Sequence, residues 1–294
     1  MLAVANRVPV SRRYRLLFVV ALLSAATTVA RAGEVDTEHL FGFTTGADTG
    51  NVGERELESE VTDRFGKQAG SYNAFSQTYE VKIAPVENFQ IGVGTALAYF
   101  GISGAPGLPD RQQTTLQGLS VDLRYKLIDN QRGPFSLTII AEPRWDRLDD
   151  IGGGAVNGYG GTFTVAIDKE LIADRLFGAV NLLYDTEASD LIVAAMWQRD
   201  SRIGISTALS LQIRPALFVG GEVRYQRVYS GLGLDTFAGQ AVFAGPTTYY
   251  QISKNWAVSA AWDFQVYGKT AQGAGLDLTH FERQQVLARF NYTF

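Results

Sequence analysis

The chain has 294 residues, 46% of them hydrophobic, and a formal net charge of −4. Its mean hydropathy of −0.01 excludes a bundle of membrane helices, because each such helix needs about 20 nearly uninterrupted apolar residues. The absence of cysteine excludes a disulfide framework and a cysteine-ligated metal.

The N-terminus has the pattern of a cleavable secretory signal. Four arginines between Arg7 and Arg15 precede the apolar run 16–23, and Ala30-Arg31-Ala32 supplies a small-residue cleavage site. A membrane anchor is the alternative, but the apolar run is too short to span a bilayer. We therefore predict a signal peptide over residues 1–32. Its removal leaves a net charge of −9, which argues against nucleic acid as a partner.

From residue 70 onward, apolar residues alternate with small or polar ones. In the stretch 89–99, one face carries Phe89, Ile91, Val93, Leu97 and Tyr99, which is the period of a strand with one apolar face. The stretch 54–66 alternates more weakly and is taken as the first strand. Similar runs follow at roughly 72–84, 89–101, 114–127, 135–147, 159–170, 174–186, 202–214, 216–229, 240–252, 255–267 and 281–294.

The connections between these twelve runs alternate in length. Short turns are expected at 85–88, 129–133, 171–173, 214–215 and 253–255, and longer, mostly glycine-rich loops at 102–112, 148–158, 187–201, 230–239 and 268–280. Bacterial outer-membrane barrels combine short periplasmic turns with longer extracellular loops. We therefore predict an all-β fold, a single antiparallel up-and-down transmembrane barrel of about twelve strands over residues 54–294. A soluble β-sandwich is the alternative.

The last strand carries aromatics at alternating positions, Phe290, Tyr292 and Phe294. This ending resembles the terminal signature of Gram-negative outer-membrane β-barrels. The resemblance implies an outer-membrane location, contact with its lipids and lipopolysaccharide, and recognition by the barrel-assembly machinery. It does not imply one activity, since porins, lipid-modifying enzymes and adhesins share this architecture.

An outward apolar face places charges of both signs inside the barrel. Four arginines are expected to face Glu58, Glu60, Glu142 and Glu222. Close charges inside a narrow wall must pair or hold water, so they either stiffen a filled barrel or line an aqueous path. The predicted lumen ladder is Glu58, Glu60, Glu80, Lys82, Asp122, Arg124, Glu142, Arg144, Glu222, Arg224, Asp263 and Arg289.

Residues 33–53 precede the first predicted strand. They form a periplasmic tail, an additional strand, or a segment that folds into the lumen. In the last case Phe41 and Phe43 are the expected contacts of a gate, and deleting residues 34–50 raises conductance.

Few residues are available for catalysis. Outer-membrane phospholipases and lipid A deacylases resemble this chain in architecture and use Ser-His pairs, but Ser206 lies in a predicted strand and matches G-x-S-x-G only weakly. His280 with Ser201, or with Asp149-Asp150 as in omptin-like proteases, is a further candidate. Asp146, Asp149 and Asp150 lack a calcium-loop pattern. We predict no enzyme, cofactor or metal.

The function expected from the sequence is a porin-like outer-membrane channel, in which small solutes diffuse through a lumen of mixed charge. Two alternatives remain open. One is a closed barrel that anchors the envelope or binds a partner, and the other is a lipid-acting hydrolase.

Overall fold

The computed structural model describes residues 35–130, 133–192, 196–271 and 273–294, so the predicted signal peptide lies outside the described residues. No helix in this part of the chain is long and apolar enough to cross a membrane. The strands in it are β1 (Arg55–Phe65), β2 (Ser71–Val86), β3 (Phe89–Ser103), β4 (Arg111–Ile128), β5 (Ser136–Leu148), β6 (Ala155–Ile172), β7 (Leu176–Leu191), β8 (Met196–Arg214), β9 (Leu217–Ser230), β10 (Thr236–Gln251), β11 (Trp256–Thr270), β12 (Gly273–Ala274) and β13 (Gln284–Thr293).

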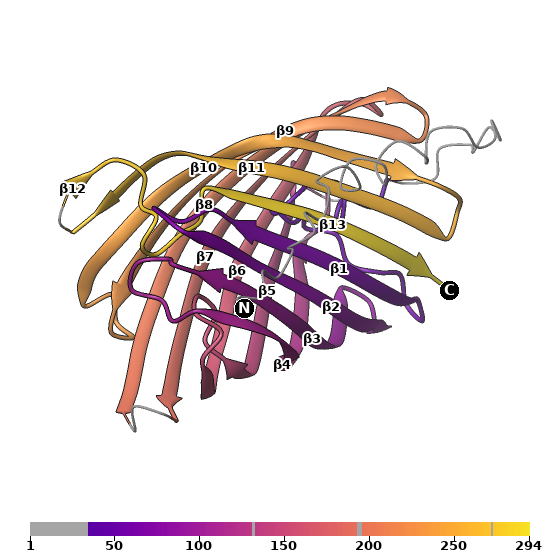
Figure 1. Cartoon of the computed structure of the whole chain (residues 1–294). Helices are drawn as coiled ribbons and strands as arrows, with labels where there is room; N and C mark the ends of the chain where they lie inside the picture. Colours follow the sequence, from indigo (N-terminus) through magenta and orange to yellow (C-terminus); the bar gives the residue numbers. More distant parts are fainter. Residues whose placement is uncertain (1–34, 131–132, 193–195, 272) are drawn as a thin grey trace, which may run out of the picture.

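Twelve of these strands close into one barrel (Figure 1). Each strand from β1 to β11 pairs antiparallel with its neighbour in sequence, β11 pairs with β13, and β13 pairs with β1. The short β12 pairs only with the end of β11. The predicted fold class, an all-β antiparallel barrel of twelve strands, is confirmed.

The strands alternate between an apolar outer face and a lumenal face. On β11, Trp262 and Phe264 are exposed, whereas Asp263 and Gln265, which alternate with them, are buried. Exposed large apolar side chains occur on strands all around the wall, with Val93 on β3 as one example at 59% exposure. Such a surface suits lipid, because a soluble monomer rarely exposes a large continuous apolar area.

Tight turns gather at the end of the barrel where the C-terminus leaves, which we call the turn end. The turn between β2 and β3 is Glu87-Asn88, and that between β8 and β9 is Pro215-Ala216. Asn88 adopts a φ of 64°, a left-handed conformation that asparagine tolerates better than most residues. These turns fall where the sequence predicts them.

The opposite end, which we call the loop end, has shorter loops than expected. Residues 187–201 are mostly strand, because β7 continues to Leu191 and β8 begins at Met196. Residues 230–239 are shortened in the same way. These strand ends are mostly polar, and the exposed Met196 and Trp197 are adjacent in sequence, so the ends carry no two-residue alternation of the kind a lipid-facing strand shows.

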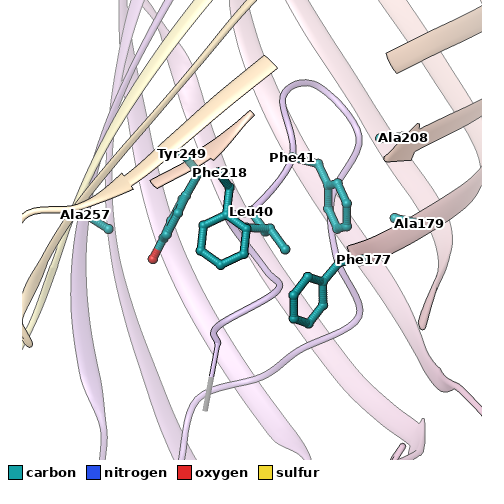
Figure 2. Close-up of a cluster of buried hydrophobic side chains, with 8 residues drawn as sticks. All are labelled: Leu40, Phe41, Phe177, Ala179, Ala208, Phe218, Tyr249 and Ala257. Carbon is teal, nitrogen blue, oxygen red and sulfur yellow. The ribbon is translucent and has the colours of Figure 1, made fainter. Parts of the chain in front are cut away.

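The segment before β1 lies inside the barrel. We call residues 37–48 the plug. It is an irregular loop in which the Gly46 amide donates to the Glu38 carbonyl over 3.3 Å. The side chains of Leu40 and Phe41 are fully buried, and Figure 2 shows them among aromatic side chains of the wall.

Candidate functional site

An apolar cluster anchors one side of the plug. Leu40 and Phe41 lie against Phe177 of β7, Phe218 of β9 and Tyr249 of β10 (Figure 2). The three wall rings pack edge to face, with centroids 5.8 Å apart in each consecutive pair. Burying a side chain of this size stabilises the plugged state by roughly 1.5–3 kcal/mol.

Glu222 of β9 binds the tip of the plug. Its carboxylate accepts hydrogen bonds from the backbone amides of Phe43 and Thr44 and from the Thr44 hydroxyl, each over 2.8 Å. Glu222 is 3% exposed, and the peptide groups it contacts would otherwise be buried without partners at high cost. This carboxylate therefore fixes the irregular backbone at the centre of the lumen.

Two further wall side chains bind the backbone of the plug. Asn181 of β7 accepts from the Thr45 amide and donates to the Thr45 carbonyl, both over 2.8 Å. Asp168 of β6 accepts from the Thr37 hydroxyl over 2.5 Å and from the Ala47 amide over 2.7 Å. Asp168 thus holds both ends of the loop together.

Charged groups of the wall complete the contacts. Glu38 of the plug receives the ammonium of Lys82 at 2.7 Å and the guanidinium of Arg124 at 2.9 Å. The ring of Phe43 lies 3.8 Å from the guanidinium carbon of Arg224, a cation–π contact. The plug is therefore held by apolar, polar and ionic contacts at once.

A cavity lies at each end of the barrel, on either side of the plug. The turn-end cavity has a volume of about 700 Å³ and is lined by eight acidic and three lysine side chains among others. The loop-end cavity has a volume of about 460 Å³ and is lined by seven acidic and three arginine side chains among others. Arg144 lies in the wall of the loop-end cavity, 2.6 Å from Asp185 and 3.0 Å from Asp146.

All twelve residues of the predicted lumen ladder lie on the inner face. Five are half-buried: Glu60, Glu80, Glu142, Arg144 and Arg289. The other seven are buried: Glu58, Lys82, Asp122, Arg124, Glu222, Arg224 and Asp263.

Their partners differ from the expected ones. Arg289 does meet Glu58 and Glu60, at 3.4 and 2.6 Å. Arg224 pairs with Asp263 at 2.7 Å, however, and leaves Glu222 to the plug. Arg144 likewise pairs with aspartates of β5 and β7, because the stagger between strands decides which inward positions are level.

The predicted catalytic candidates make structural contacts instead. Ser201 and His280 line the same loop-end cavity, with β9, β10 and β11 between them in the wall. The Ser201 hydroxyl donates to the Gly231 carbonyl, and His280 Nδ1 lies 3.0 Å from Asp277. In the described part of the chain, no hydrogen bond joins His280 to Ser201 or Ser206.

The acidic residues Asp149 and Asp150 also make structural contacts. Asp150 forms a salt bridge of 2.8 Å with Arg64 of β1, and Asp149 accepts the Gly152 amide within its own loop.

Sequence reasoning missed Asp168 and Asn181, even though both occupy inward positions of predicted strands. The alternation alone would have placed Asn181 inside, between outward Val180 and Leu182.

The closed barrel, its apolar belt and its charged interior define an outer-membrane β-barrel. Residues 33–294 match DUF6662, a family of unknown function, and the chain belongs to this family. A search of curated protein sequences finds no match.

Solved structures of similar fold come from several bacteria. A COG4313 outer membrane channel from Pseudomonas putida F1 has a TM-score of 0.58 at 12% identity, covering 84% of this chain and 98% of that one. The β domain of the Bordetella autotransporter BrkA gives 0.52 at 11%, covering 83% and 100%. The translocator domain of the Neisseria meningitidis autotransporter NalP gives 0.50 at 13%, covering 84% and 91%. At these identities the likeness concerns the fold.

Proposed function

We propose that this protein is an outer-membrane channel for small polar solutes whose lumen is closed by the plug. One observation carries the proposal. Two charged cavities open at opposite ends of the barrel, and the plug lies between them. A barrel that served only as an anchor has no need for a polar cavity on each side.

The polar contacts of the plug are of a kind that water can replace. In the part of the chain that the structure describes, no backbone hydrogen bond joins residues 37–48 to a strand of the wall. The segment is held by side chains such as Glu222 and Asn181, so it can leave the lumen without breaking the β-ladder. Exchanging a hydrogen bond to a neutral side chain for water changes stability by about 1 kcal/mol, and exchanging one to a carboxylate by about 1.5–3 kcal/mol.

Short turns face the periplasm in bacterial outer-membrane barrels, which supports a turn end in the periplasm and a loop end outside the cell. The plug then enters from the periplasm. The similarly folded Pseudomonas protein is described as an outer membrane channel, which supports the proposal, while the autotransporter domains show that the fold serves other tasks as well.

The charge of the cavities predicts a preference among solutes. Acidic side chains outnumber basic ones in both cavities, eight to three at the turn end and seven to three at the loop end. A cleft lined by one sign of charge concentrates counter-ions. We infer that small cationic and neutral solutes pass more readily than anions of the same size.

A vesicle flux assay tests this function. The protein from residue 33 and a variant lacking residues 35–50 are refolded into vesicles, and the entry of a small sugar, a cationic amino acid and an anionic one is followed by swelling. The deletion variant is expected to admit solutes at least about tenfold faster than the full protein, with the anion slowest. A folded deletion variant whose vesicles stay tight would favour the closed structural barrel.

A further inference from the structure

Carboxylates outnumber fixed cations where the plug meets β1. Three fixed cations, Lys82, Arg124 and Arg289, and the imidazole of His39 serve the ion pairs that the described residues form there. The carboxylates that share them are Glu38, Glu56, Glu58, Glu60, Glu80 and Asp122. Six carboxylates around three fixed cations and one imidazole leave a buried deficit of positive charge, which is costly in a poorly solvated site.

His39 of the plug lies inside this group and is 2% exposed. Its Nε2 atom is 2.9 Å from Oε1 of Glu56 and 3.6 Å from Oε1 of Glu38. Nε2 nevertheless makes no hydrogen bond, although it is fully buried. A buried imidazole nitrogen that faces two carboxylates at ion-pair distance, without the geometry of a hydrogen bond to either, is suited to share a cation with them.

The spacing of these atoms fits a metal ion. One ligand atom each from Glu38, His39, Glu56 and Glu58 lies within 4.8 Å of the others. Zinc bonds to nitrogen and oxygen of about 2.0–2.2 Å in a tetrahedral site place neighbouring ligand atoms roughly 3.3–3.5 Å apart. The two distances from Nε2 of His39 lie on either side of that range.

We propose that Glu38, His39 and Glu56 form a binding site for a divalent transition metal, with Glu58 within reach as a fourth ligand. The imidazole favours zinc, nickel or copper over magnesium or calcium, which prefer oxygen ligands alone. This departs from the expectation that the chain holds no metal, which rested on the absence of a sequence motif.

Lys82 is the competitor for this site. Its ammonium lies 2.7 Å from both Glu38 and Glu58 but 3.5 Å from Glu56. A metal between His39, Glu38 and Glu56 leaves Glu58 to pair with Lys82. The bound ion removes the deficit of positive charge without displacing the lysine from the lumen.

The site opens toward one side and joins two parts of the molecule. Glu38 and Glu56 both line the turn-end cavity, so an ion enters from that end. Glu38 and His39 belong to the plug, whereas Glu56 belongs to β1. A bound metal therefore ties the plug to the wall and holds the lumen closed, a consequence that rests on the proposed channel function.

Isothermal titration of the refolded protein with zinc chloride tests the site directly. We expect one zinc ion per chain and at least about 100-fold weaker binding of magnesium. H39Q and E56Q are each expected to weaken zinc binding at least about tenfold. H280Q, which removes the only other imidazole of the chain, is the matched control and should bind as the unaltered protein does. Each variant is first shown to be folded by its heat-modifiable gel mobility.

The proposal is overturned if zinc does not bind, or if H39Q binds it as well as H280Q does. Cobalt provides a second readout, because an imidazole and carboxylate site gives it a visible absorption band that H39Q should lack. Conductance separates the two proposals. Zinc that binds but leaves an open channel unblocked would refute the tie between metal and plug and leave the site standing.

Discussion

In the proposed channel, Glu222 is the residue on which closure of the lumen depends most directly. It accepts three hydrogen bonds from two consecutive plug residues, Phe43 and Thr44. Hydrogen bonds to a charged group contribute about 1.5–3 kcal/mol each. The substitution E222Q keeps the shape but turns an NH₂ group toward backbone donors. We expect the ratio of open to closed time in single-channel recordings to rise at least about tenfold.

Glu187 provides the control for this prediction. It is a lumenal carboxylate of β7 that contacts Arg144 at 3.5 Å and Ser189, and none of these residues belongs to the plug. E187Q is therefore expected to leave the open fraction unchanged. Equal effects of the two variants would mean that the charge of the lumen, and not the contact with the plug, governs opening.

For a single residue, the sequence predicts which face of the barrel wall its side chain occupies but not which side chain it pairs with. The period of two places Arg224 and Asp263 inside, yet nothing in the sequence pairs them. That pairing depends on how β9 and β11 are staggered around the barrel. Arg224 also lies on the ring of Phe43, so exchanging it for serine is expected to loosen the plug as well as to remove a lumenal charge.

Among the elements, the closing strand β13 is stabilised by aromatic contacts with β11. Trp256 packs against Phe290 and Tyr292, with ring centroids 4.8 and 4.2 Å apart. Such pairs contribute about 0.5–1.5 kcal/mol each beyond the area they bury. W256A is expected to lower the free energy of unfolding by about 2 kcal/mol, measured by urea titration in lipid vesicles.

Trp197 of β8 gives the comparison for this variant. It is 52% exposed, and none of the ring pairs formed by the described residues includes it. W197A should change the free energy of unfolding by less than about 0.5 kcal/mol. A W256A protein as stable as W197A would show that the terminal aromatics act in assembly alone, which is the role that their resemblance to the outer-membrane signature implies.

The elements were predictable from the sequence as far as lipid shapes them. Strand count and tight turns such as Glu87-Asn88 follow from alternation and from turn residues. The loop end did not follow, since β7 and β8 pair there through polar residues such as Glu187 and Asp200. Where water contacts both faces of a strand, apolar and polar residues need not alternate, so the strand cannot be recognised from the sequence.

For the whole molecule, the state of the lumen is the central question. Residues 33–53 show no period and offered three placements in the sequence. Only the structure brings Thr37 and Ala47 together on Asp168. A segment fixed by side chains from β6, β7 and β9 leaves no local signal, because its partners are more than a hundred residues away.

Single-channel conductance of the variant lacking residues 35–50 tests the gated channel most directly. We predict a steady, salt-dependent conductance where the full protein is mostly closed. A synthetic peptide of residues 35–50, at about a millimolar to match the effective concentration of a tethered segment, should block that current when added at the turn end only. A deletion variant that is folded but carries no current would contradict the account.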